Sequence, residues 1–115
     1  MGYKYLNLDF LKSLVPGSPD EVNGLLVSCV ENINEIIVQV KSSAQKNEWS
    51  SLKFSSHQLK SNFKILGMND IAELVQAIES DAHSQKNLET ISNRITNVLG
   101  HWEKAAMEIE QELKK

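Results

Sequence analysis

The sequence predicts an all-α fold, an antiparallel four-helix bundle with a short extra helix at the N-terminus. Apolar residues recur at alternating intervals of three and four in every long segment, the pattern of a core-facing amphipathic helix. Only two prolines occur, and neither interrupts a long pattern. The expected helices are joined by short connections, which favour antiparallel neighbours. No internal repeat or low-complexity tract is visible.

Length and composition indicate one domain over residues 1–115. The chain has 115 residues, 41% of them hydrophobic and 23% charged, which is enough for one adequate core. No apolar stretch approaches the roughly 20 residues of a membrane span, and the start lacks the layout of a signal peptide, so we expect a cytoplasmic monomer. A pI near 5.6 argues against general nucleic-acid binding. The single cysteine, Cys29, permits no intramolecular disulfide, and we expect it to be buried.

Two helices are expected in the N-terminal part. A short helix or lid covers residues 7–15 and is closed by Pro16 and Gly17; its apolar register comprises Leu8, Leu11 and Leu14. A capping box at residues 18–21, with Pro19 at the first helical position, opens the second helix, which runs to about Ser43. Its apolar stripe comprises Val22, Leu25, Leu26, Cys29, Val30, Ile33, Ile36, Ile37 and Val40.

Three further helices are expected after it. Asn47 is expected to cap the third helix and Gly67 to end it, with a core stripe of Trp49, Leu52, Ser56, Leu59, Phe63 and Leu66. Asn69 is expected to cap the fourth helix, and residues 81–87 to form a polar loop. The last helix runs from about Leu88 to Leu113, with Ile91, Ile95, Val98, Trp102, Ala105, Ile109 and Leu113 on one side.

His57 is expected on the polar side of the third helix. At about 100° of rotation per residue, the centre of the core stripe lies roughly 150° from His57. Lys53, Lys60 and Lys64 follow at positions minus four, plus three and plus seven from it, and residues so spaced are neighbours on a helix surface. With three lysines and one acidic residue, residues 47–67 carry plus two on a chain of net charge minus three. The sequence therefore predicts a local positive field around the imidazole, which suits a phosphorylated histidine.

These residues carry a family resemblance. The run His57-Gln58-Leu59-Lys60, then Gly67 ten residues after the histidine, then a short helix ending in Glu79, resembles the histidine-containing phosphotransfer (HPt) domain of multistep phosphorelays. The resemblance implies a helical bundle with His57 as the phosphorylated residue. Ser61 stands where the family usually has glycine, and Lys64 where many members carry a small residue. The phosphorylation face is therefore expected to be more crowded and more basic than usual.

The resemblance also implies a reaction and its partners. His57 would accept a phosphoryl group from a receiver-domain aspartyl phosphate, attack through Nε2, and pass the group to another receiver aspartate. Lys60 and Lys64 would stabilise charge, and the receiver, which could belong to a hybrid sensor kinase, would supply Mg²⁺, so this chain needs no cofactor. The chain has no glycine-rich phosphate loop with a strand before it, which argues against autonomous kinase activity.

Several other residues are weaker candidates. Phe54 lies about 60° from His57 on the helical wheel, away from the core, and is interpreted as part of an apolar docking surface. Lys53, Gln58, Ser61 and Gly67 are expected to contact a partner, although Lys53 could equally solubilise the helix and Gln58 could face solvent. Glu79 reads as a surface or helix-end charge, and His83 and His101 as solvated residues. No two histidines have the spacing of metal ligands on one helix, so no metal site is expected.

Two other functions stay open at this point. The first is a noncatalytic helical adaptor that binds receiver or kinase domains, against which the presence of His57 argues. The second is a structural or oligomerising bundle in which the lysine face is only solvent cover. A stable dimer that buries the His57 face would favour the second.

Overall fold

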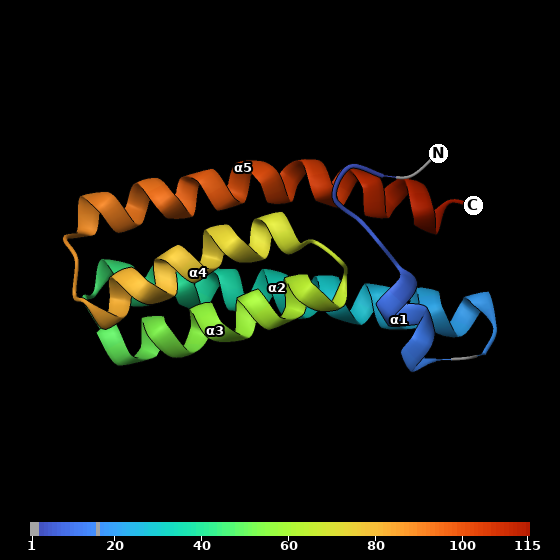
Figure 1. Ribbon diagram of the computed structural model, residues 1–115, viewed down its shortest axis with the longest axis horizontal. Coiled ribbons are helices and arrows are strands. Elements are labelled where there is room, and N and C mark those ends of the chain that lie inside the picture. Colours follow the sequence, from blue (N-terminus) through green and yellow to red (C-terminus); the bar gives the residue numbers. More distant parts are fainter. Residues whose placement is uncertain (1–2, 16) are drawn as a thin grey trace.

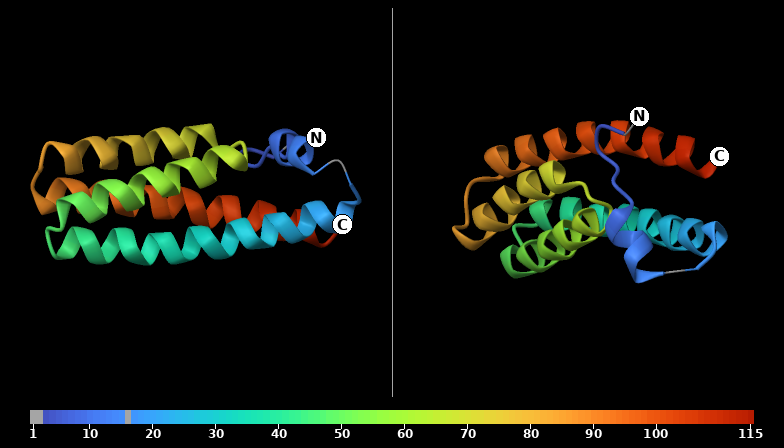
Figure 2. Two further views of the ribbon diagram at one scale, coloured as in Figure 1. Left: turned by 90° about the horizontal axis from the view of Figure 1, so that it is seen from below. Right: turned by 45° about the vertical axis from the view of Figure 1, so that its right-hand side comes forward.

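The computed structural model describes residues 3–15 and 17–115, which form five α-helices (Figure 1). They are α1 (Asp9–Leu14), α2 (Pro19–Gln45), α3 (Trp49–Ile65), α4 (Asn69–His83) and α5 (Leu88–Leu113). The long helices α2 to α5 lie side by side around one core, each antiparallel to the next, and α1 packs against α2 near one end of the bundle (Figure 2). The predicted four-helix bundle with an extra N-terminal helix is confirmed. None of the described helices is both long and apolar enough to cross a membrane.

The core consists of the apolar stripes that the spacing predicts, with two corrections. Phe63, Ile91 and Leu26 are fully buried, and the Phe63 and Trp102 rings pack 5.6 Å apart. Leu14 is 55% exposed and Leu25 37% exposed, so both predictions of burial are wrong. The helix α1 has only six residues and buries just Leu11, and Leu14 is its exposed last residue. Cys29 is half-buried against the core, and this burial raises the pKa of its thiol.

Three helices end in the same way, and this corrects one predicted cap. The residue two positions beyond the last helical residue is Asn47, Gly67 or Gln85, with φ of 54°, 72° and 54°. The next backbone N–H donates to a carbonyl five residues back, as in Glu48 to Ser43 at 2.9 Å, which is the hydrogen bond of a Schellman motif. Gly67 ends α3 as predicted. Asn47 ends α2 and does not cap α3, whose N-cap position is Glu48 without a side-chain hydrogen bond.

The two ends of α4 also differ from the expectation. Asn69 is the first helical residue and Met68 occupies the N-cap position without a side-chain cap. The helix continues to His83, so the first three residues of the predicted polar loop are helical. Asp81 is buried and its carboxylate accepts a hydrogen bond from the guanidinium of Arg94 on α5. Arg94 is itself 45% exposed, so it reaches from the surface to supply the opposite charge that a buried carboxylate needs.

The N-terminal caps of α2 and α5 are conventional. Ser18 accepts a hydrogen bond from the backbone N–H of Glu21, and Pro19 occupies the first helical position, as predicted. The side chain of Asn87 accepts one from the N–H of Thr90 at 2.9 Å and starts α5, which runs to Leu113 as predicted. The predicted closure of α1 at Pro16 lies outside the described residues.

The N-terminal segment, residues 3–8, crosses the bundle before α1 begins (Figure 1). Tyr5 and Leu6 are buried. The carboxylate of Glu108 on α5 accepts hydrogen bonds from the backbone N–H groups of Lys4, Tyr5 and Leu6 at 2.9 to 3.1 Å. The N–H of Asn7 donates to the carbonyl of Leu66 at 3.0 Å. The segment therefore ties α5 to the turn between α3 and α4, an arrangement that the sequence did not indicate.

Candidate functional site

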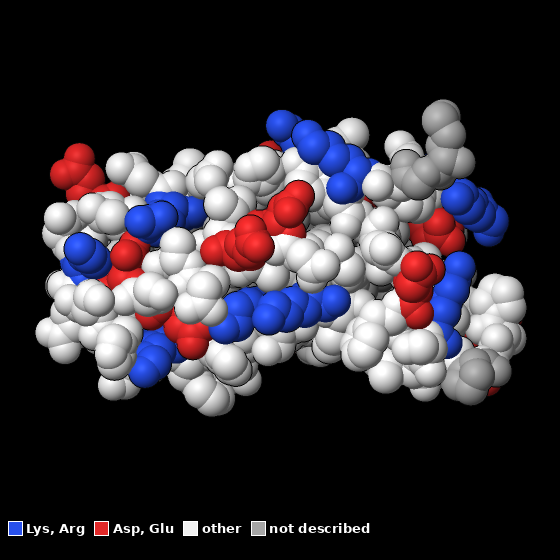
Figure 3. Space-filling view, viewed as in Figure 1, with Lys and Arg blue, Asp and Glu red and all other residues white. Residues whose placement is uncertain are grey.

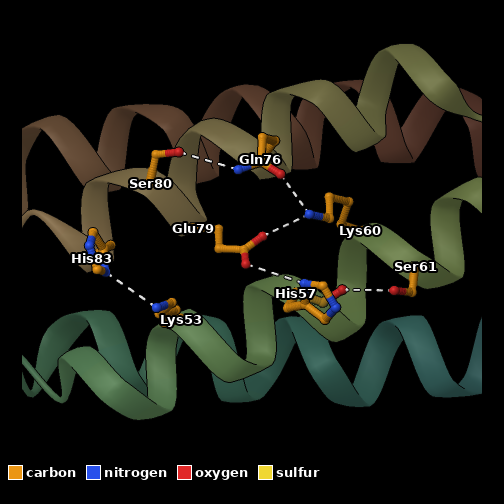
Figure 4. Close-up of polar contacts among 8 residues, drawn as sticks. All are labelled: Lys53, His57, Lys60, Ser61, Gln76, Glu79, Ser80 and His83. Atoms are coloured by element: carbon orange, nitrogen blue, oxygen red, sulfur yellow. Dashed lines mark hydrogen bonds and ion pairs between the residues drawn. The ribbon is translucent and has the colours of Figure 1, made fainter.

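His57 lies on α3 with 60% of its side chain exposed, on the side that faces α4 (Figure 4). The core stripe of α3 places Leu59 and Phe63 inside, so the helical rotation turns His57 outward. The predicted exposure of the imidazole is confirmed. Its position leaves the ring open to a partner molecule while one edge contacts the neighbouring helix.

Glu79 on α4 joins His57 to Lys60. Its Oε2 lies 3.2 Å from Nδ1 of His57, and its Oε1 accepts a hydrogen bond from Nζ of Lys60 at 2.9 Å. The side chains of Glu79 and Lys60 are only 15% and 14% exposed. Both carboxylate oxygens are therefore engaged, and the two residues beside the histidine have little freedom to move. Sequence reasoning treated Glu79 as a surface charge and missed this position.

Lys60 is held against α4 by a second acceptor. Its ammonium group donates to Oε1 of Gln76 at 2.6 Å, and Nε2 of Gln76 donates to the hydroxyl of Ser80 at 3.3 Å. Figure 4 shows this chain of polar contacts running from Ser80 through Gln76 and Lys60 to Glu79. The Glu79 carboxylate thus lies between the ammonium group of Lys60 and the imidazole of His57.

The electrostatics of the site are set by this carboxylate. Burial alone would raise the pKa of Glu79, but hydrogen bonds and charge from Lys60, together with the hydrogen bond to His57, hold that pKa below its ordinary value of 4.5. Glu79 is therefore ionised at neutral pH. Hydrogen bonds donated to a carboxylate and positive charge beside it favour the ionised form, and both lower the pKa.

The expected ring of ammonium groups around His57 is not what the structure shows. Lys60 points to Glu79, and Nζ of Lys53 lies 3.2 Å from Nδ1 of His83 on α4. Lys64 is exposed one turn beyond Lys60. Blue side chains follow α3 across this face, with red ones among them (Figure 3). The helical wheel treated α3 alone, whereas the neighbouring helix supplies a negative charge.

The other candidate residues lie along α3 and at its C-terminal end. Phe54 is 64% exposed, as predicted, and with Val38 of α2 it lines a groove of about 400 Å³ between α2 and α3. Ser61 donates its hydroxyl to the backbone carbonyl of His57 at 3.1 Å, and Gln58 is half-buried. Gly67 lies at the far end of α3, where a Cβ would come within 2.5 Å of Asn7. The structure gives Gly67 a role in the turn, and its contact with a partner stays a prediction.

The remaining histidines differ from each other. His83 is exposed, as predicted. His101 is half-buried, and its Nδ1 lies 2.8 Å from the hydroxyl of Tyr5, so the prediction of a solvated side chain is wrong for it. The segment around Tyr5 covers this part of α5, which the helical pattern of α5 could not reveal. Within residues 3–15 and 17–115, no three His, Cys, Asp or Glu side chains gather in a way that could hold a metal ion.

Comparison with known proteins gives a match to one family model and to one solved structure. The family model described as the Hpt domain matches residues 24–114. The crystal structure of histidine-containing phosphotransfer protein B from Pseudomonas aeruginosa PAO1 superposes with a TM-score of 0.72 at 18% sequence identity, over 98% of this chain and 97% of that chain. At this identity the likeness shows the fold. No curated protein matches the chain.

Proposed function

The chain belongs to the Hpt domain family, the histidine phosphotransfer intermediates of phosphorelays, and on that premise we propose that His57 is the residue that carries the phosphoryl group. It is the histidine of the run His57-Gln58-Leu59-Lys60. It is also the exposed histidine beside a carboxylate and an ammonium group that are both mostly buried. The alternative of a noncatalytic adaptor is not favoured, because the chain belongs to this family and has the histidine that phosphotransfer requires.

The observation that carries the proposal is the contact between Nδ1 of His57 and Oε2 of Glu79 at 3.2 Å. An ionised carboxylate accepts hydrogen bonds and donates none, so Nδ1 carries the proton. In a neutral imidazole the other nitrogen then presents its lone pair. Glu79 therefore assigns the role of nucleophile to Nε2. The two ring nitrogens point in diverging directions, so Nε2 is directed away from α4.

The reaction follows from that assignment. Nε2 attacks the phosphorus of an aspartyl phosphate in line, the N–P bond forms, the bond from phosphorus to the aspartyl oxygen breaks, and the carboxylate leaves with the electron pair. The ring becomes positively charged while Nδ1 keeps its proton, and the Glu79 carboxylate stabilises that charge. Such transfers depend on positioning and charge stabilisation more than on covalent help. Lys60, whose ammonium group has a third N–H beyond those that bind Glu79 and Gln76, would neutralise phosphoryl oxygens together with Lys64 of the next turn.

The partners are receiver domains of response regulators, those of hybrid sensor kinases included. The receiver would supply the acidic residues and the Mg²⁺ that phosphoryl transfer requires, and this chain would supply the imidazole. Phe54, with Lys53, Gln58 and Ser61 around it, would form the surface on which a receiver docks. We propose further that the chain is a monomer when it meets a receiver, because a dimer that buried the His57 face would block transfer, and that the two meet in the cytoplasm.

The test is transfer from a phosphorylated receiver. Radiolabelled receiver domains from the same genome are mixed with wild-type protein, with His57→Gln and with His83→Gln, a matched control that removes another exposed histidine. We expect label on the wild type and on His83→Gln, in an acid-labile and alkali-stable form, and none on His57→Gln. The melting temperature should be unchanged in both variants, because both side chains are exposed. Label that persists on His57→Gln would overturn the assignment.

A further inference from the structure

A groove on the side of the bundle away from His57 plays no part in the proposed reaction. It lies between α2 and α5 and has a volume of about 300 Å³. The helices α2 to α5 pack in a ring in which α3 and α4 are neighbours and α2 and α5 close the other side. The contact between His57 and Glu79 bridges α3 and α4. The groove and the phosphorylation site are therefore on different faces of the molecule.

The floor of the groove is apolar. Trp102 lies in it and donates its indole N–H to the side chain of Asn34 at 3.1 Å. The other apolar lining residues are Val27, Val30, Ala106, Ile109 and Leu113. Val27 is 41% exposed. An apolar side chain that remains this accessible between two helices is available to a partner.

The length and shape of the groove suit a helix. Its lining spans residues 27–34 of α2 and 102–113 of α5, which correspond to roughly 10 Å and 16 Å of helix at 1.5 Å per residue. The longer side is thus about three helical turns of 5.4 Å. A volume of about 300 Å³ is at the lower end for a small-molecule pocket. It fits a few anchoring side chains of an amphipathic helix laid along the groove.

The rim of the groove is acidic. Glu31 of α2 and Glu110 of α5 line it, and all four charged residues of α2 between Pro19 and Val40 are carboxylates: Asp20, Glu21, Glu31 and Glu35. On α5, Lys104 is two residues from Trp102, and the rotation of about 200° that separates them turns Lys104 to another face.

The acidic rim determines which kind of partner can bind in the groove. Two copies of this chain meeting groove to groove would bring like charges together, which disfavours a homodimer at this site. An acidic helix would be repelled in the same way. From this complementarity we propose that the α2–α5 groove is a docking site for a basic amphipathic helix of a partner protein, whose apolar side chains contact Trp102 and whose lysine or arginine side chains pair with Glu31 and Glu110.

The first test uses a defined probe and an internal reporter. An 18-residue helical peptide of leucine and lysine is titrated into protein with Trp49→Phe, so that Trp102 is the remaining tryptophan. The same peptide with glutamate in place of lysine is titrated in parallel. We expect a saturable change in Trp102 emission with the lysine peptide and none with the glutamate peptide. Equal binding of both peptides, or no change with either, would overturn the proposal.

The second test separates the groove from net charge. In one variant Glu31→Lys and Glu110→Lys reverse the rim; in the matched control Glu73→Lys and Glu89→Lys make the same charge change at exposed positions on α4 and α5. We expect the rim variant to bind the lysine peptide at least tenfold more weakly and the control to change less than twofold. Equal weakening in both, or a dimer whose contacts protect the groove, would overturn the proposal. Phosphoryl transfer to His57 serves as the folding control.

Discussion

Oε2 of Glu79 lies 3.2 Å from Nδ1 of His57, although 22 residues separate the two in sequence. The other oxygen of the same carboxylate binds Lys60. One side chain on α4 thus fixes both the proton on the imidazole and the position of the neighbouring ammonium group. Because the carboxylate is ionised and mostly buried, water screens its charge on the ring less than it would screen the charge of an exposed carboxylate.

Glu79→Gln removes the charge of this carboxylate and keeps an oxygen that can accept from Nδ1. We expect phosphoryl transfer to His57 to slow by about fivefold, since a hydrogen bond to a charged partner is worth roughly 1 kcal/mol more than a neutral one and a barrier higher by about 1 kcal/mol lowers a rate about fivefold. Single-turnover transfer from a phosphorylated receiver measures it. Glu73→Gln, an exposed residue on the same helix, should transfer at the wild-type rate. An unchanged rate in Glu79→Gln would mean that the carboxylate does not assist the reaction.

The same residue predicts how stability depends on pH. The pKa of Glu79 in the folded protein is below its ordinary value of 4.5, so the unfolded chain binds a proton more readily than the folded one. Its contribution to stability is therefore complete above pH 4.5 and is lost as the pH falls from there through the lowered pKa. Melting temperatures of wild type and Glu79→Gln should differ most above pH 4.5 and converge below it. A gap that stays constant down to acidic pH would contradict the linkage.

The fold followed from the sequence because each long helix carries its own apolar stripe, but the helix ends were less certain. Asn47 illustrates the difficulty. Asparagine is common both at N-caps and in the left-handed position after a helix, and both places lie between α2 and α3. The hydrogen bond from the N–H of Glu48 to the carbonyl of Ser43 decides for the second, and it depends on how α2 leaves the bundle rather than on local residue type.

The sequence predicted the site residues on α3 but not the contact that they make with Glu79 on α4. A helical wheel relates His57 to Lys60, which share a helix, but Glu79 meets them only through the packing of two helices. A signal was nevertheless present. His57 lies 8 residues before the end of α3 and Glu79 lies 10 residues after the start of α4, which is roughly 12 Å and 15 Å from the turn at 1.5 Å per residue. Antiparallel helices joined by a short turn bring such positions side by side.

Replacing Ser56, the residue before His57, by alanine is expected to stabilise the protein. Its side chain is fully buried in the core stripe of α3, and its hydroxyl has no hydrogen-bond partner among the described residues. Removing a buried unsatisfied hydroxyl relieves its desolvation penalty. We expect Ser56→Ala to stabilise the protein by about 1 kcal/mol, which thermal or urea unfolding can measure.

Ser51→Ala is the matched control for that substitution. Ser51 lies on α3 and is exposed, so it reports the small gain in helix propensity alone. Transfer to His57 should be unchanged in Ser56→Ala, because Ser56 faces the core. A loss of stability in Ser56→Ala would indicate that the hydroxyl has a bound partner after all, such as a buried water.

Gly67 should tolerate no side chain. Its φ of 72° is in the left-handed region, and a Cβ there would lie 2.5 Å from Cβ and 2.6 Å from the carbonyl oxygen of Asn7. We expect Gly67→Ala to destabilise the protein by more than the roughly 1–2 kcal/mol of the backbone conformation alone. Gly24→Ala and Gly100→Ala, in helices with nothing within 4 Å of the new Cβ, should instead stabilise by about 0.5–1 kcal/mol. The same sign at all three positions would contradict the close contact with Asn7.

Glu108 is expected to control whether the N-terminal segment stays docked. Its carboxylate accepts hydrogen bonds from the backbone of Lys4, Tyr5 and Leu6. A hydrogen bond to a charged group contributes roughly 1.5–3 kcal/mol net, and water can replace part of that here because Glu108 is only half-buried. We expect Glu108→Ala to destabilise the protein by about 2 kcal/mol and to accelerate hydrogen exchange at the amides of Tyr5 and Leu6. Exposed Glu103 on the same helix provides the control, since Glu103→Ala should change neither.

Exchange on α3 distinguishes release of the segment from loosening of the whole bundle. The amides of Leu59 and Phe63, in the buried stripe beside His57, should stay better protected in Glu108→Ala than those of residues 5–6, because the backbone hydrogen bond from the segment to this part of the bundle is at Leu66, where α3 ends. Transfer to His57 should then proceed at the wild-type rate. If instead α3 and residues 5–6 lose protection together, the segment is part of the cooperative core, and Glu108 stabilises the phosphorylation site as well as the N-terminus.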